Sequence, residues 1–280
     1  MIEFTDFQGT GPEFHFLHAN GYPPACYLPL IDLIKEKYHV TGMHLRPLWP
    51  GSKPSEISSW HPFSEDFRNF LAEQNFGPII AAGHSLGAVI SLRAALKYPS
   101  LFRALILIDP VIFSPRMITS YRLINAVGLS DKFHPWIKGA LRRRRKFDNL
   151  DALFNAYRRK SIFHYFSDES LWAYIHGIAK PSSQGGFELT FSPEWEAQIY
   201  HTGIWPDMDL WKNLPSLSVP TLIIRGSETD TFLPAAARRI KRIRPEIVIT
   251  SVKEATHLVP LEKPQETFDI IQNFLATHLK

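Results

Sequence analysis

Short apolar runs alternate with segments of helical period along the chain. Six runs predict strands, several of them nearly continuous in apolar character, as in parallel strands buried on both faces. These runs are EFHFLH (13–18), HVTGMHL (39–45), PIIAAGH (78–84), RALILID (103–109), VPTLIIRG (219–226) and EIVITSVKEATH (246–257). Between and after them, helical periodicity predicts helices over 59–75, 85–97, 234–244 and 264–279. The alternation predicts an α/β fold with a doubly wound, mostly parallel sheet.

The alternation stops between residues 112 and 213. This segment is rich in aromatic and cationic residues, has helical periodicity and contains no strand of comparable strength. It holds 18 of the 36 aromatic residues of the chain, which favours a folded subdomain over a linker. We therefore predict a core made of residues 1–111 and 214–280, with a helical cap inserted as residues 112–213. Because few residues precede the first long strand, we expect the leading edge of the sheet to be short.

The composition excludes several classes of protein. No apolar run approaches the roughly 20 residues that a membrane helix needs, and the acidic start of the chain is unlike a secretory signal. The single cysteine, Cys26, excludes an internal disulfide and fits a reducing compartment. We therefore expect a cytoplasmic protein that does not associate with a membrane.

The basic charge of the chain is local. The formal net charge is +4, whereas the run from Arg142 to Lys146 alone carries five cations. Such a run could bind nucleic acid or anionic lipid. It has no interleaved aromatic residues and no known nucleic-acid motif, so we interpret it as a solvated helix face and expect no nucleic-acid partner.

One serine lies between two glycines where a predicted strand turns into a helix. Gly83 and Gly87 flank Ser85 in GHSLG. Glycines at these positions permit a tight strand-to-helix turn that projects the serine from the top of the sheet, at a helix N-terminus. The motif alone is equally compatible with a simple helix N-cap.

Later strand ends carry the two partners that a nucleophilic serine requires. A serine hydroxyl needs a base to take its proton, and the base needs an orienting acid. Asp230 lies in the loop after the run at 219–226, and His257 lies in the loop after the run at 246–257. The order Ser, Asp, His is typical of the strand–turn–helix nucleophile motif.

Taken together, these motifs resemble the α/β-hydrolase superfamily. The resemblance is carried by HANGYP (18–23), GHSLG (83–87), LILIDP (105–110), VPTLIIRGSETD (219–230) and ATHLVPLEKP (255–264). It implies Ser85 as nucleophile, Asp230 as acid and His257 as general base, with the insertion as a lid. Asp109 and Glu228 are the alternatives for the acid, and the position of Asp230 four residues before Pro234 favours Asp230.

The resemblance also implies an oxyanion hole. The backbone amide of Leu86, directly after the nucleophile, is one expected donor. The second should come from the HANGYP loop, where relatives commonly carry His-Gly and this chain has His-Ala-Asn-Gly. Asn20 is favoured by position, with Gly21 and Tyr22 as alternatives. We expect His84 to have a packing role.

We therefore expect a serine hydrolase that cleaves a small to medium apolar carboxylic ester or thioester through an acyl-enzyme, without metal or cofactor. Carbon–carbon bond hydrolysis, lactone hydrolysis and perhydrolysis are alternatives on the same triad, and a non-catalytic ligand-binding module is an alternative of another class. Tyr22 and Trp195 are candidate substrate contacts. Other aromatic residues of the insertion could line a pocket as well, and these are Trp136, Tyr157, Trp172, Tyr174, Tyr200 and Trp205. The sequence leaves the acyl and alcohol groups, the oligomeric state and movement of the cap open.

Overall fold

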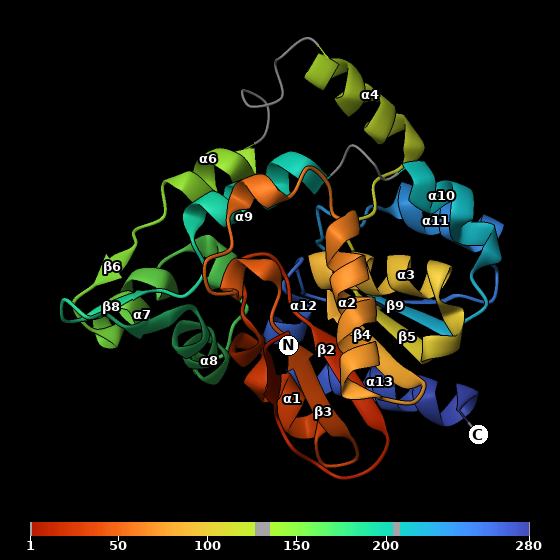
Figure 1. The fold of residues 1–280 in the computed structure, drawn as a ribbon, viewed down its shortest axis with the longest axis horizontal. Helices are drawn as coiled ribbons and strands as arrows, with labels where there is room; N and C mark the ends of the chain where they lie inside the picture. Colours follow the sequence, from red (N-terminus) through yellow and green to blue (C-terminus); the bar gives the residue numbers. More distant parts are fainter. Residues whose placement is uncertain (1, 127–134, 204–207, 280) are drawn as a thin grey trace.

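A computed structural model describes residues 2–126, 135–203 and 208–279. Trp205 lies outside the described residues. The core is a seven-stranded sheet in the order β1-β3-β2-β4-β5-β9-β10 (Figure 1). Its strands are β1 (Phe4–Asp6), β2 (Glu13–Leu17), β3 (His39–Met43), β4 (Ile79–His84), β5 (Phe102–Ile108), β9 (Thr221–Gly226) and β10 (Val248–Val252). The doubly wound α/β fold class predicted from the sequence is confirmed.

All neighbouring strands of this sheet are parallel except β1, which pairs antiparallel with β3. The sheet therefore starts with one three-residue edge strand, in agreement with the expected short leading edge. The parallel strands all end at the same edge, so the loops that follow β2, β4, β5, β9 and β10 meet there.

Helices cover both faces of the sheet (Figure 1). They are α1 (Leu28–Ile34), α2 (His61–Gln74), α3 (Leu86–Lys97), α11 (Pro234–Ile243), α12 (Val259–Glu262) and α13 (Pro264–His278). The four predicted helices correspond to α2, α3, α11 and α13, with ends that differ by one or two residues. In contrast, α1 was not predicted. It is seven residues long, and such a short segment shows little periodicity.

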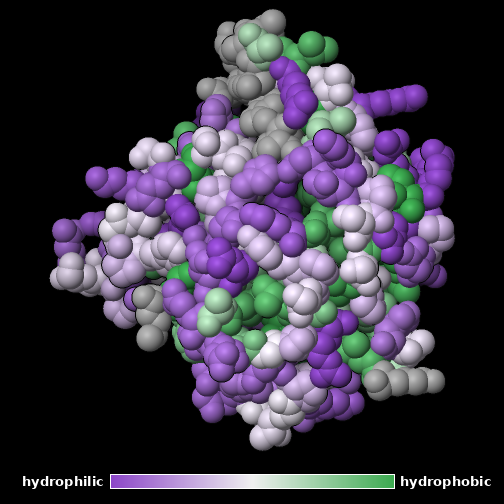
Figure 2. Space-filling model, turned by 45° about the vertical axis from the view of Figure 1, so that its right-hand side comes forward, coloured by the Kyte–Doolittle hydropathy of each residue, from purple (hydrophilic) through white to green (hydrophobic). Residues whose placement is uncertain are grey.

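Side chains of each strand alternate between two apolar cores. In β4, Ile79 and Ala81 pack with α2, α3 and α11, whereas Ile80 and Ala82 pack with α1 and α13. Both sets are fully or almost fully buried, as expected for a strand covered on both faces. The outer surface is different: Figure 2 shows hydrophilic residues over most of the face that it presents.

The segment from 112 to 213 carries further helices and a small sheet, mostly above and to the left of the large sheet in Figure 1. Its helices are α4 (Pro115–Ala126), α6 (Pro135–Leu141), α7 (Leu150–Arg158), α8 (Asp168–Ile178), α9 (Pro193–Gly203) and α10 (Met208–Asn213). Its strands are β6 (Lys146–Phe147), β7 (Ala179–Pro181) and β8 (Phe187–Leu189), joined antiparallel in the order β6-β8-β7. Strands of two or three residues are too short to produce a periodic pattern, which is why the sequence did not indicate them.

Short 3₁₀ helices complete the described structure. They are η1 (Pro24–Tyr27), η2 (Arg46–Leu48), η3 (Pro54–Glu56), η4 (Pro99–Leu101), η5 (Ser161–Phe163) and η6 (Leu214–Ser216). Across the ranges that the structure describes, no helix has the length and apolar character required to cross a bilayer.

Candidate active site

The turn between β4 and α3 places Ser85 at the carboxyl edge of the sheet. Ser85 has φ 55° and ψ −113°, a backbone conformation that residues other than glycine rarely adopt. A Cβ atom on Gly83 would lie 2.4 Å from the backbone of Gly87, and one on Gly87 would lie 2.1 Å from the carbonyl oxygen of Leu17. Both glycines are therefore required for the chain to turn so sharply, and the turn exposes the hydroxyl beyond the strand end.

The serine hydroxyl lies beside an imidazole from a distant part of the chain. Ser85 Oγ is 2.9 Å from His257 Nε2, and His257 is in the loop after β10. The opposite ring nitrogen, Nδ1, faces a carboxylate and donates to it, so Nε2 is left as the acceptor for the serine proton. The structure thus brings together the predicted nucleophile and the predicted base.

The carboxylate that holds His257 is Asp109, not Asp230. Asp109 Oδ1 lies 2.9 Å from His257 Nδ1, and Asp109 directly follows β5. The favoured acid was therefore wrong, and the alternative from the earlier strand occupies the position. Gly226 at the end of β9, and Thr229 and Thr231 in the loop after it, donate hydrogen bonds to the Asp109 carboxylate, whereas the Asp230 side chain is exposed.

Asp109 is fully buried and saturated with hydrogen bonds. Its Oδ1 accepts the hydroxyl protons of Thr229 and Thr231 at 2.5 and 2.6 Å, and its Oδ2 accepts the backbone N–H of Gly226 at 2.9 Å. Burial raises the pKa of Asp109, but the hydrogen bond and charge of His257 and the two hydroxyls outweigh it, so the pKa is lowered. This aspartate is therefore ionised at neutral pH and can stabilise an imidazolium.

Thr231 also contacts the imidazole itself. Its Oγ1 lies 2.8 Å from His257 Nδ1 while its proton points to Asp109. The Nδ1 proton is therefore shared between two oxygen atoms, and this restricts rotation of the ring. Sequence analysis missed Thr229 and Thr231, although they flank Asp230 directly. The pattern Thr-x-Thr at a strand end was the available signal.

The two other acidic candidates lie near the site without holding the imidazole. Asp230 is exposed, and Glu228 accepts a hydrogen bond from the Tyr165 hydroxyl at 2.8 Å. Both side chains line the same cavity as Ser85 and His257. They therefore contribute negative charge to the wall of the cavity.

The two residues expected to supply the oxyanion hole lie beside Ser85. Asn20 and Leu86 line a small recess together with Ser85. The amide of Tyr22 donates to the carbonyl of Ala19, so Tyr22 is not free to supply the second donor through its backbone. The Asn20 side chain is turned to the insertion, where its Nδ2 donates to the carbonyl oxygen of Glu196 at 3.0 Å. This anchor fixes the loop that carries the proposed donor.

A chain of hydrogen bonds ties this loop to the loop of the base. The Ala19 amide donates to the Tyr27 hydroxyl at 3.1 Å, and Tyr27 lies 2.8 Å from His84 Nδ1. His84 Nε2 lies 2.8 Å from the carbonyl oxygen of His257. Burial and the nearby His257 lower the pKa of His84 to about 3, so the ring is neutral. His84 is thus buried and structural, and it positions the base through the backbone.

A cavity of about 330 Å³ opens above Ser85 and His257. The insertion supplies part of its wall through Trp136, Ile162 and Tyr200, and Tyr22 supplies another part. Trp195 instead packs in the hydrophobic core with 3% exposure and is not among the residues that line this cavity. Within the described part of the chain, no three metal-binding side chains are grouped so as to hold an ion.

The basic run is not a helix face. Only Arg142 adjoins α6, and residues 143–145 have no regular secondary structure and lead into β6. Arg143 turns inward and forms an ion pair with Glu196 at 2.5 Å, with side-chain exposures of 15% and 10%. The interpretation of the run as a solvated helix face was therefore wrong, because α6 ends at Leu141, before the run begins.

Comparisons with known proteins agree with this architecture. The family model described as the alpha/beta hydrolase family matches residues 16–270. The chain is similar to 2-(acetamidomethylene)succinate hydrolase from Mesorhizobium japonicum, with 25% identity over 96% of this chain and 89% of the relative. Among solved structures it resembles E-2-(acetamidomethylene)succinate hydrolase, with a TM-score of 0.78, 22% identity and coverage of 98% and 95% of the two chains. It also resembles the thioesterase domain from the curacin biosynthetic pathway, with a TM-score of 0.69, 16% identity and coverage of 97% and 98%. The chain therefore belongs to the alpha/beta hydrolase family.

Proposed function

We propose that the protein is a serine hydrolase that cleaves a carboxylic ester or thioester through an acyl-enzyme. The observation that carries the proposal is the continuous contact from Ser85 Oγ to His257 Nε2, and from His257 Nδ1 to Asp109, each at 2.9 Å. A nucleophile, a base and an orienting acid in this order are what acyl transfer requires. The family and the hydrolase activity in the name of the Mesorhizobium relative support the same class of reaction.

The proposed reaction starts with proton transfer. His257 Nε2 takes the proton of Ser85 as Oγ adds to the substrate carbonyl, and the Asp109 carboxylate stabilises the imidazolium that forms. The carbonyl oxygen gains a negative charge, which the amides of Leu86 and Asn20 stabilise from the small recess. The bond to the alcohol or thiol then breaks, and His257 returns its proton to the leaving group.

Water completes the cycle. His257 takes a proton from a water molecule, whose oxygen adds to the acyl carbonyl. The bond to Ser85 then breaks, His257 returns the proton to Ser85 Oγ, and the acid product leaves. The volume of about 330 Å³ suits a small to medium acyl group, and the apolar parts of Trp136, Val111 and Ile162 suit the hydrocarbon next to the carbonyl. The expectation of an apolar substrate therefore applies to the part of the substrate next to the reacting carbonyl.

The test is a pair of serine variants. Ser85→Ala should lower kcat/KM for p-nitrophenyl esters of graded chain length by about 10⁴-fold or more. Ser227→Ala is the matched control, since Ser227 is exposed at the end of another strand. A fluorophosphonate probe should label the wild type and not Ser85→Ala. Wild-type rates in Ser85→Ala would overturn the nucleophile, and folded wild type that neither reacts nor labels would indicate a binding module.

A further inference from the structure

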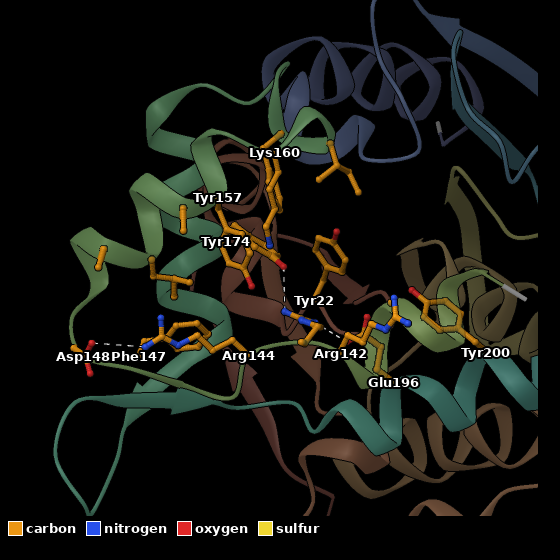
Figure 3. A pocket seen from close by; sticks show the side chains of 17 residues that line it. Tyr22, Arg142, Arg144, Phe147, Asp148, Tyr157, Lys160, Tyr174, Glu196 and Tyr200 are labelled. Atoms are coloured by element: carbon orange, nitrogen blue, oxygen red, sulfur yellow. Dashed lines mark hydrogen bonds and ion pairs between the residues drawn. The ribbon is translucent and has the colours of Figure 1, made fainter.

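A second cavity, of about 500 Å³, lies beside the one above Ser85. The two cavities share three wall residues, Tyr22, Ile162 and Tyr200. In Figure 3, Tyr22 lies between Tyr200 on one side and Tyr157, Tyr174 and Lys160 on the other. The two cavities are therefore adjacent at these three residues.

The wall of the second cavity has an excess of cations. Four cationic side chains line it, and two carboxylates accompany them. One carboxylate, Glu196, forms an ion pair with Arg143. The other, Asp148, forms an exposed ion pair with Arg144 at 3.7 Å. The cations without such a neighbour are Arg142 and Lys160: among the described residues, no carboxylate is within ion-pair distance of either.

Opposing electrostatic effects act on the Lys160 ammonium group. Its Nζ lies 3.7 Å from the centre of the Tyr157 ring, which is attracted to the cation through its π face. Burial lowers the pKa of Lys160, and the nearby charge of Arg143 lowers it further. A bound anion would offset the repulsion between Lys160 and Arg143, so the protonated form of Lys160 is more favourable when a negative group is present.

Neutral hydrogen-bond donors surround the same space. Tyr22, Tyr157, Tyr174 and Tyr200 all line the cavity. The Tyr174 hydroxyl lies 3.3 Å from Arg143 Nη2, which accordingly donates to it and leaves the hydroxyl proton free to point elsewhere. Cations together with phenolic donors are the groups that recognise carboxylates and phosphates in proteins.

We propose that this cavity is a subsite for an anionic group, a carboxylate or a phosphate, on the substrate whose carbonyl reacts at Ser85. The inference rests on the proposed function and adds that the substrate is charged at the end remote from the reacting bond. It assigns a role to the first three cations of the basic run, Arg142 to Arg144, which were interpreted from the sequence as solvated surface. A concave wall that includes the inward-turned Arg143 suits a small anion better than a nucleic-acid backbone.

The first test compares substrates that differ only in charge. Mono-p-nitrophenyl glutarate is paired with p-nitrophenyl methyl glutarate, and butyryl-coenzyme A with the butyryl thioester of N-acetylcysteamine. The first pair places a carboxylate on the acyl side, and the second places phosphates on the leaving group. In at least one pair, we expect kcat/KM of the wild type to be about tenfold or more higher for the anionic member, and that pair identifies the source of the charge.

Variants locate the preference in the cavity. Lys160→Met combined with Arg142→Gln should reduce the ratio of anionic to neutral kcat/KM by about tenfold or more. The matched control is Arg159→Met combined with Lys138→Gln, which removes two exposed cations close in sequence that do not line either cavity. An unchanged ratio in the first variant, or an equal fall in the control, overturns the subsite.

A binding measurement keeps the inference separate from the reaction. Glutarate and inorganic phosphate are titrated calorimetrically into the wild type and into both double variants. At least one anion should bind the wild type and the control, and should bind Lys160→Met with Arg142→Gln about tenfold more weakly. Absence of binding to the wild type overturns the subsite. Failure of Ser85→Ala to lower turnover overturns the proposed function alone, since neither anion needs the nucleophile.

Discussion

The surroundings of Asp109 and the wall of the second cavity use charge in opposite ways. Asp109 is a single buried charge to which the surrounding groups donate four hydrogen bonds. The wall of the second cavity carries several cations, most of them exposed, and Arg142 and Lys160 lack a carboxylate within ion-pair distance in the described structure. The first arrangement fixes a geometry, whereas the second leaves electrostatic attraction for a ligand. Sheet edges therefore supply the proposed chemistry, and the inserted segment supplies the proposed selection of substrate.

Of the changes that test this comparison, removal of the buried Asp109 charge should have the largest effect. Asp109→Asn should lower kcat by about 10⁴-fold, because an amide can present its N–H₂ group to Nδ1 and favour the wrong imidazole tautomer. Asp230→Asn is the matched control and should lower kcat less than tenfold, since Asp230 is exposed and lies on the cavity wall. Steady-state kinetics with p-nitrophenyl butyrate checks both. If Asp230→Asn has the larger effect, the carboxylate assignment from the geometry is wrong.

A fall in pH should lower the free energy of unfolding through buried histidines of the core. Three buried histidines, His15, His18 and His84, have their pKa lowered to about 3 by burial, against 6.5 in the unfolded chain. Below pH 6.5 these histidines bind protons in the unfolded chain but remain neutral in the native state. The free energy of unfolding therefore falls as the pH drops towards 3. At pH 5.5 we expect a loss of about 1 kcal/mol for each histidine relative to neutral pH.

Urea denaturation at pH 7 and pH 5.5, at equal ionic strength, measures this loss. His15 accepts the amide of Met43 with Nε2 and contacts the Thr41 hydroxyl with Nδ1, so glutamine can replace one donor and one acceptor there. The loss between the two pH values should be about 1 kcal/mol smaller in His15→Gln. Equal stability of the wild type at both pH values would contradict the prediction.

A smaller loss of stability should follow when the Tyr27 hydroxyl, which links the loop of Ala19 to His84, is removed. Tyr27→Phe leaves the Ala19 amide and His84 Nδ1 without their partner in the buried core, which should cost about 2 kcal/mol of unfolding free energy. Arg145→Ala, which removes an exposed ion pair with Glu194, should cost less than about 1 kcal/mol. Denaturation at pH 7 compares them. A larger cost for Arg145→Ala would show that the charged insertion contributes more to stability than the buried chain.

The sequence was informative where local patterns determine local structure. The GHSLG turn, the strand runs and the positions of Ser85 and His257 at strand ends each follow from residues that are close together in the sequence. The choice between Asp109 and Asp230 was not local, since both follow strands of the same sheet edge. It depends on which carboxylate points to the imidazole, and on the hydrogen bonds that Thr229 and Thr231 donate to Asp109. The inward turn of Arg143 likewise depends on Glu196, a partner 53 residues away.

The hydrogen-bonded chain through Tyr27 and His84 can hold only one arrangement of protons. It begins at the Ala19 amide, which cannot accept a proton, and it ends at the His257 carbonyl, which cannot donate one. Every link must therefore point the same way, and reversal is forbidden at both ends. His84 therefore cannot relay a proton to or from Ser85, although it is the preceding residue in the chain. In the proposed reaction, only the imidazole of His257 transfers protons.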